Sequence, residues 1–116
     1  MTTTIFHNPR CSKSRQALEL LEQRGTEIDI VRYLETPPDA ATLVDLLERL
    51  GLSARELMRK GEDPYKELNL DNTELSEAQL VQAMVDYPKL IERPIVIHDG
   101  KAVIGRPPER VLELFA

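Results

Sequence analysis

The residue best suited to nucleophilic chemistry is Cys11, the only cysteine among the 116 residues of this chain. Arg10, Lys13 and Arg15 flank it, and the first carboxylate of the chain comes only at Glu19. A cysteine at a helix start faces unpaired backbone N–H groups and the positive end of the helix dipole, which favour thiolate over thiol. A lone cysteine is ordinarily a buried apolar group, but cationic neighbours argue against that here. We therefore expect a reactive thiol in an anion-binding environment.

Two arginines are candidates for holding an anion beside this thiol. Arg93 and Arg106 each precede a proline, and the residue before a proline is kept in extended backbone, which limits where its side chain can point. A planar guanidinium matches an oxyanion better than the single charge of lysine. Most arginines are solvated surface groups, so the two converge only if the fold brings them together.

Histidine and serine near Cys11 are the remaining polar candidates. Cys11-x-x-Ser14 places a hydroxyl where dithiol oxidoreductases carry a second cysteine, and a hydroxyl can donate to a thiolate. His7 ends an apolar run, where a packed imidazole and a role beside Cys11 are equally open. His98 has no evident partner and is expected to be structural. One cysteine and two distant histidines do not form a metal-binding set, so we expect neither a metal nor a bound cofactor.

Composition limits the class of protein. The length suits one domain over residues 1–116, and 41% hydrophobic with 30% charged residues is typical of a globular protein. A net charge of −5 argues against nucleic-acid partners and anionic membranes. The sequence carries neither a secretory-signal pattern nor a run of membrane-spanning length, so we expect a cytoplasmic protein. A single cysteine makes any redox cycle depend on thiols from elsewhere.

The elements that position Cys11 are expected to be a strand, a helix and a second strand. Thr4–His7 has the pattern of a short strand, and helically spaced apolar residues follow until Gly25. Glu27–Val31 alternates like a half-buried strand. Cys11 therefore lies at the first strand-to-helix turn of a βαβ unit, the end of an α/β sheet where ligands bind.

The middle of the chain is expected to be helical. Asp39 can cap a helix that runs to Gly51. Capping-box patterns begin two further helices at Ser53 and Ser76, the second ending before Pro88.

The last part is expected to contain a hairpin and a helix. Residues 95–98 and 101–104 flank Asp99-Gly100, which indicates a type I′ turn, and Pro107 fits the first turn of a final helix. The order βαβ, helices, ββα predicts an α/β thioredoxin-like fold, with a mixed four-stranded sheet and a helical insertion after the second strand. In that fold a cis proline often precedes the third strand, and Arg93-Pro94 stands there, although about 95% of such bonds are trans.

Five separated segments resemble the glutaredoxin-coupled arsenate reductase family: HNPRCSKSR, RYLETPP, ELMRKGEDPYKELNL, ERPIV and GRPPE. They occur in the family's order and extend over essentially the whole chain. The resemblance is to the shorter members, without a C-terminal extension.

This resemblance implies a function and a set of site residues. Cys11 matches the nucleophile that forms a thiol-arsenate adduct. Glutathione would then displace the adduct as a co-substrate, and glutaredoxin would reduce the mixed disulfide, with arsenite as the product. The other matching positions are the three arginines associated with arsenate, Arg59, Arg93 and Arg106, and two residues thought to support the thiolate, His7 and Ser14.

Three other functions compete with this interpretation. Phosphatase-like arsenate reductases need a C-x5-R loop, and Ala17 stands where that arginine would be. An Spx-type transcription regulator shares the fold and binds RNA polymerase, but typically senses oxidation through C-x-x-C, which Ser14 interrupts. A general thiol-transferase would bind glutathione without needing three arginines for an oxyanion. The last two remain alternatives.

Overall fold

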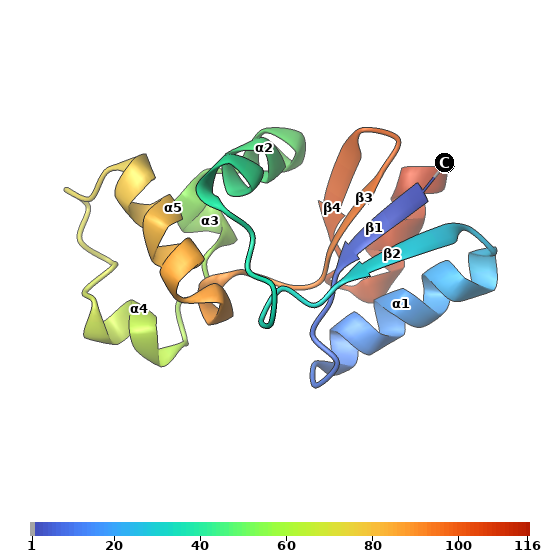
Figure 1. The fold of residues 1–116 in the computed structure, drawn as a ribbon, viewed down its shortest axis with the longest axis horizontal. Helices are drawn as coiled ribbons and strands as arrows, with labels where there is room; N and C mark the ends of the chain where they lie inside the picture. The colour runs from blue at the N-terminus through green and yellow to red at the C-terminus, as the bar shows by residue number, and fades with distance from the viewer. Residues whose placement is uncertain (1) are drawn as a thin grey trace. The chain divides into compact units, whose positions relative to one another are not determined.

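The computed structural model describes residues 2–116, which divide into two compact units (Figure 1). The first comprises the chain up to Thr36 together with Arg93–Ala116, and the second is Pro37–Glu92. The expectation that residues 1–116 form a single domain stays a prediction. None of the helices in the described part of the chain is long and apolar enough to cross a membrane.

The first unit contains a four-stranded mixed sheet in the order β2-β1-β3-β4. β1 and β2 are parallel, β3 is antiparallel to β1, and β4 is antiparallel to β3. This topology confirms the predicted thioredoxin-like sheet. The strands are β1 (Thr2–Phe6), β2 (Glu27–Val31), β3 (Ile95–His98) and β4 (Lys101–Ile104).

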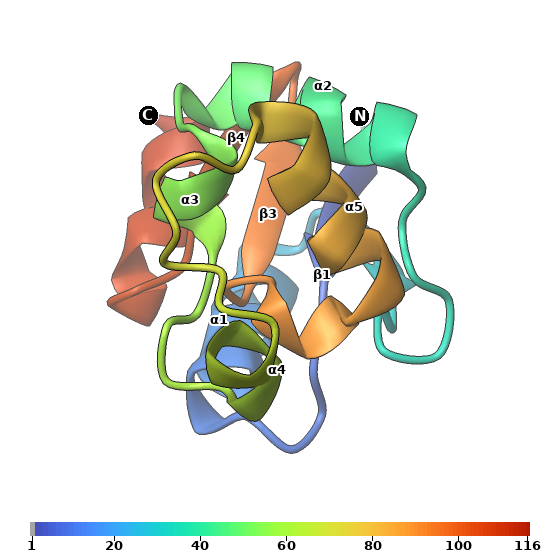
Figure 2. The same cartoon turned by 90° about the vertical axis from the view of Figure 1, so that its left-hand side faces the viewer.

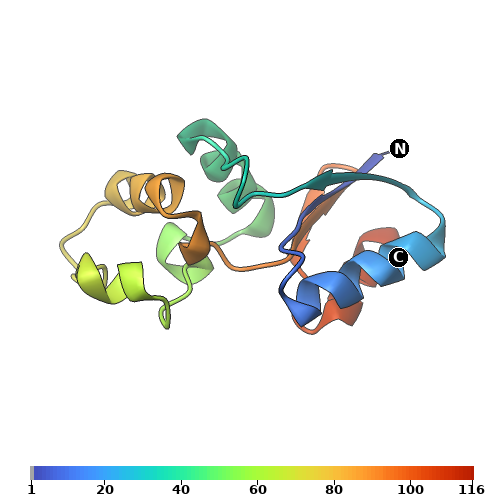
Figure 3. The same ribbon diagram turned by 60° about the horizontal axis from the view of Figure 1, so that its bottom comes forward.

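One face of this sheet is covered by α1 (Ser12–Arg24) and by the 3-10 helix η2 (Pro108–Phe115), as Figure 3 shows. The strands alternate in side-chain direction, so alternate residues of β1 and β3 point into the layer between sheet and helices. The buried core of this layer consists of Ile5, Ala17, Leu21, Val96, Val111 and Leu114. It anchors the start of α1, and therefore Cys11, against the sheet.

The β3–β4 hairpin has the turn that its sequence predicts. Asp99 and Gly100 both adopt positive φ, at 52° and 77°, as the two central residues of a type I′ turn must. His98 has partners that the sequence did not reveal. Its Nδ1 lies 2.9 Å from Thr3 Oγ1, and its ring packs against Phe115.

The segments before β3 and after β4 run side by side. Gly105 N donates to the Pro94 carbonyl oxygen at 2.9 Å, and both Arg93-Pro94 and Arg106-Pro107 are cis peptide bonds. A Cβ at Gly105 would lie 2.9 Å from Pro94 Cγ and 3.1 Å from Val111 Cγ1. Only glycine fits there without displacing its neighbours.

The second unit is helical, as predicted (Figure 2). Asp39 caps the first helix by accepting from Thr42 N, and Ser53 and Ser76 both form complete capping boxes. The apolar faces of these helices supply the unit's buried residues, such as Leu46, Leu57 and Met84. The helices are α2 (Ala40–Leu50), α3 (Ala54–Leu57), α4 (Asp63–Glu67), α5 (Glu77–Asp86) and the 3-10 helix η1 (Pro88–Leu90).

Three details differ from the sequence expectations. β1 covers Thr2–Phe6 rather than Thr4–His7, because Thr2 and Thr3 pair in register with β2. The final helix is a 3-10 helix that begins at Pro108, with Pro107 as its extended N-cap. α4 and η1 were not predicted, since helices of one turn are too short to show an apolar periodicity.

Candidate active site

Cys11 lies in a tight turn between β1 and α1. Its N–H donates to the Asn8 carbonyl oxygen at 3.0 Å, and the Arg10 N–H donates to Asn8 Oδ1 at 3.0 Å. Arg15 closes the turn from the helix side by donating to the Pro9 carbonyl oxygen. Cys11 is itself the N-cap residue of α1, and its side chain makes no capping hydrogen bond. The partly exposed sulfur therefore sits at the start of the helix, as predicted.

Opposing effects act on the pKa of the Cys11 thiol. Partial burial raises this pKa. Hydrogen bonds from the backbone N–H groups of Ser14 and Lys13 and the hydrogen bond and charge of the Arg93 guanidinium together lower it by more, so the pKa lies below its ordinary value. The helix start and a nearby arginine thus favour the thiolate. The flanking arginines Arg10 and Arg15 are not among the causes.

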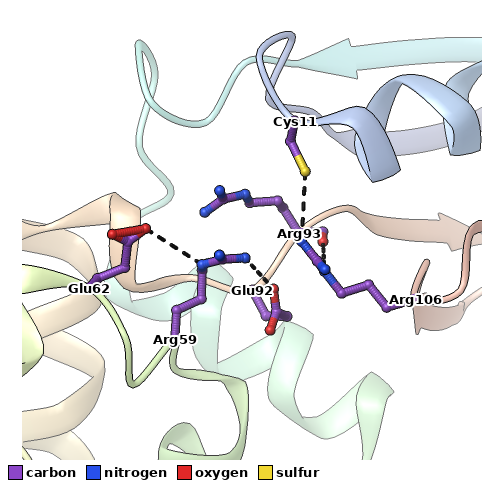
Figure 4. A network of polar contacts seen from close by, with 6 residues as sticks. All are labelled: Cys11, Arg59, Glu62, Glu92, Arg93 and Arg106. Atoms are coloured by element: carbon purple, nitrogen blue, oxygen red, sulfur yellow. Dashed lines mark hydrogen bonds and ion pairs between the residues drawn. The ribbon is translucent and has the colours of Figure 1, made fainter.

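Arg93 and Arg106 both lie beside Cys11 (Figure 4). Arg106 Nη2 is 3.7 Å from Cys11 Sγ, and Arg106 Nε donates to the Arg93 carbonyl oxygen at 2.8 Å. The first unit therefore brings together the thiol and two guanidiniums. Such a cluster can hold a tetrahedral oxyanion next to the nucleophile and stabilise the charge of a covalent adduct.

His7 and Ser14 form a buried pair behind this turn. His7 Nδ1 is 2.6 Å from Ser14 Oγ, and the Asn8 N–H donates to the same hydroxyl oxygen at 3.0 Å. Burial lowers the pKa of His7, and the charges of Arg32 and Arg15 lower it further, which keeps the imidazole neutral at neutral pH.

The hydroxyl of Ser14 is engaged by this pair. Its contacts are His7 and Asn8, whereas Ser14 acts on the thiol through its backbone N–H. The Ser14 hydroxyl oxygen accepts from the Asn8 N–H and, since a hydroxyl can both donate and accept, it pairs with His7 Nδ1 in either imidazole tautomer. The pair fixes the first turn of α1 against the end of β1.

Arg59 belongs to the second unit, where it is held by two carboxylates (Figure 4). Its Nη1 lies 2.8 Å from Glu92 Oε1, and its Nε lies 3.6 Å from Glu62 Oε1. The backbone N–H of Arg59 donates to the Leu90 carbonyl oxygen at 2.7 Å, which fixes the end of α3. The arginine assigned to arsenate by resemblance is thus ion-paired inside its own unit.

Asn8 is a positioning residue that the sequence interpretation did not single out. Its side chain, its carbonyl oxygen and its N–H bond to Arg10, Cys11 and Ser14, respectively. The signal was present, because an Asn-Pro pair commonly starts a turn in which the asparagine side chain bonds to the backbone two residues on. No group of three metal-ligating side chains occurs within residues 2–116.

Comparison with known proteins finds a matching family model, similar sequences and similar solved structures. A model of the ArsC family matches residues 6–114. The Escherichia coli protein YfgD, described as uncharacterised, is 68% identical over 111 residues, which are 95% of this chain and 93% of YfgD. An arsenate reductase from Neisseria meningitidis is 56% identical over 108 residues, 92% of each chain. A solved structure of an arsenate reductase from Vibrio cholerae has a TM-score of 0.96 at 51% identity over 98% of each chain.

Proposed function

The chain belongs to the ArsC family, and from that premise we propose that it reduces arsenate to arsenite with Cys11 as the nucleophile. The observation that carries the proposal is the placement of Arg106 Nη2 3.7 Å from Cys11 Sγ, with Arg93 beside the same sulfur. A thiolate with two guanidiniums is suited to attack on an oxyanion, because the arginines offset the repulsion between two anions.

The first step joins sulfur to arsenic. The Cys11 thiolate attacks arsenate, an oxygen leaves as water after protonation, and a Cys11-S-arsenate adduct forms with arsenic still in the +5 state. Arg93 and Arg106 bind the remaining oxygens. Because arginine stays charged at all relevant pH values, these contacts persist through the step.

The later steps need external thiols. Cys11 is the only cysteine of this sequence, so an internal disulfide cannot form. A glutathione thiolate attacks the Cys11 sulfur, the sulfur–arsenic bond breaks with its electron pair staying on arsenic, and arsenite leaves in the +3 state. Glutaredoxin then attacks the glutathione sulfur of the mixed disulfide and releases the Cys11 thiolate.

Arg59 enters the proposal through the resemblance. We propose that Arg59 also contributes to arsenate binding. Its guanidinium would then leave the ion pair with Glu92 and bind an arsenate oxygen instead. Arg59→Gln is expected to raise the KM for arsenate at least as much as it changes kcat.

The test is arsenate-dependent NADPH consumption with glutathione, glutaredoxin and glutathione reductase. The wild-type protein should support turnover, and Cys11→Ala should abolish it. Arg110→Gln is a suitable control, because Arg110 lies on the surface of η2 in a long ion pair with Glu113. Thioredoxin with thioredoxin reductase should not replace glutathione and glutaredoxin.

Two results would overturn the proposal. One is the absence of arsenate-dependent turnover from a protein that still reduces hydroxyethyl disulfide with glutathione, which would identify a thiol-transferase. The other is full arsenate turnover by Cys11→Ala.

A further inference from the structure

A pocket of about 290 Å³ lies in the first unit beside the Asn8–Cys11 turn. The segments that directly follow β1 and β2 line it, with contributions from His7, Arg10, Arg32, Leu34 and Glu35. This is the end of the sheet at which the chain also places Cys11, since Arg10 directly precedes the nucleophile. The roles given above to the site residues do not account for this pocket.

The two arginines of the pocket have no acidic partner in the part of the chain that the structure describes. Neither the Arg10 nor the Arg32 guanidinium forms an ion pair with any of the residues 2–116, and both side chains are exposed. Glu35, on the same rim, is likewise in no ion pair with the described residues. The rim therefore presents two available positive charges and one negative charge.

His7 adds a buried polar group to the pocket lining. It is only 6% exposed, and Nδ1 is occupied by Ser14. Its Nε2 makes no hydrogen bond to any residue between 2 and 116. The pocket thus combines a buried imidazole nitrogen with two guanidiniums, and guanidiniums are donors suited to carboxylates.

We propose that this pocket binds the carboxylates of the small peptide thiol that reacts at Cys11, with glutathione as the representative ligand. The inference rests on the proposed function for the need of an external thiol. Glutathione carries two carboxylates and one ammonium group. The two arginines and Glu35 offer the same number of groups with the opposite charges. A tripeptide spans about 10 Å, long enough for a carboxylate to lie in the pocket while the thiol reaches the neighbouring residue.

The test measures a single thiol–disulfide exchange and does not involve arsenate. The Cys11 thiolate attacks oxidised glutathione, a disulfide to Cys11 forms, and one glutathione thiolate leaves. The same rate is measured with hydroxyethyl disulfide, which has no charge. The readout is the rate constant with oxidised glutathione divided by the rate constant with hydroxyethyl disulfide, because a changed Cys11 pKa alters both reactions alike.

Arg10→Gln and Arg32→Gln should each lower this ratio by about tenfold, the loss of one charged hydrogen bond to a carboxylate. Arg110→Gln should leave the ratio unchanged. An unchanged ratio in both pocket variants would overturn the proposal.

Arsenate kinetics separate this proposal from the proposed function. In the coupled assay, the pocket variants should raise the KM for glutathione and leave that for arsenate unchanged. A raised KM for arsenate alone would overturn the pocket proposal and identify an oxyanion site. A wild-type protein without arsenate turnover, but with the arginine-dependent ratio, would remove the proposed function and leave the pocket in place.

Discussion

The guanidinium of Arg106 is held by the main chain of Arg93, to whose carbonyl oxygen its Nε donates at 2.8 Å. The same guanidinium reaches Cys11 Sγ at 3.7 Å through Nη2. A guanidinium has separate donors, so one nitrogen is anchored while another faces the sulfur. The position of this charge beside the nucleophile is therefore set by the backbone that precedes Pro94.

This relationship predicts that lysine cannot replace either arginine. Arg106→Lys keeps the charge but loses the Nε anchor, and Arg93→Lys loses the planar fork. We expect each variant to remain folded by circular dichroism and to lose roughly 1–3 kcal/mol of transition-state stabilisation in arsenate kcat/KM. Arg110→Lys is the control, and wild-type kinetics in both site variants would show that neither arginine binds the oxyanion.

The Cys11 thiol is expected to ionise below the value of about 8.5 for a free cysteine. The rate of alkylation by iodoacetamide, followed against pH, reports the thiolate directly. Arg93→Leu should shift the midpoint upward, because Arg93 is one of the groups that lower the pKa of Cys11. Arg110→Leu should leave it in place, and a wild-type midpoint at or above the free value would contradict an activated thiol.

His7 makes stability depend on pH in a defined direction. Its pKa in the folded protein lies below the value of about 6.5 in the unfolded chain, so the unfolded chain binds the proton more readily. The stability that this group contributes is present above pH of about 6.5 and is lost as the pH falls through the folded pKa. Urea unfolding at pH 7.5 and 5.5 should show this loss.

A His7→Gln variant provides the comparison. It should have a smaller difference in unfolding free energy between the two pH values, whatever its absolute stability. Equal differences in wild type and variant would mean that His7 does not titrate in this range.

Gly105 is expected to tolerate no side chain. Gly105→Ala places a Cβ within 2.9 Å of Pro94 Cγ, and overpacking of this kind costs about 1–3 kcal/mol. Gly61→Ala is the matched control, because no atom lies within 4 Å of a Cβ at that position. Urea unfolding of both variants checks the prediction, which fails if the two have the same stability.

Local signals account for what the sequence predicted well. The capping residues Asp39, Ser53 and Ser76 start their helices where expected, because each side chain bonds to the backbone N–H three residues on. Asp99-Gly100 fixes the hairpin by the positive φ that it permits. Cys11 was placed correctly by the same logic, from a strand pattern before it and a helix pattern after it.

Contacts between distant segments account for what the sequence did not predict. Arg59 and Glu92 are 33 positions apart, and nothing in either local pattern identifies them as an ion pair. The pocket formed by Arg10 and Arg32 needs the parallel register of β1 and β2, which brings the two strand ends together. The bonds of Ser14 to His7 and Asn8, likewise, follow from how α1 packs and not from the spacing of its residues.

The N-cap of α1 shows a conflict between chemistry and folding. Cys11 holds a position at which serine, threonine or aspartate would bond to the helix backbone, and its side chain makes no such bond. Cys11→Ser, the usual inactive variant, should therefore raise the unfolding free energy by about 0.5–1 kcal/mol while abolishing turnover. A higher melting temperature in that variant would measure the stability that α1 loses by having a nucleophile at its N-cap, and an unchanged or lower one would refute the trade-off.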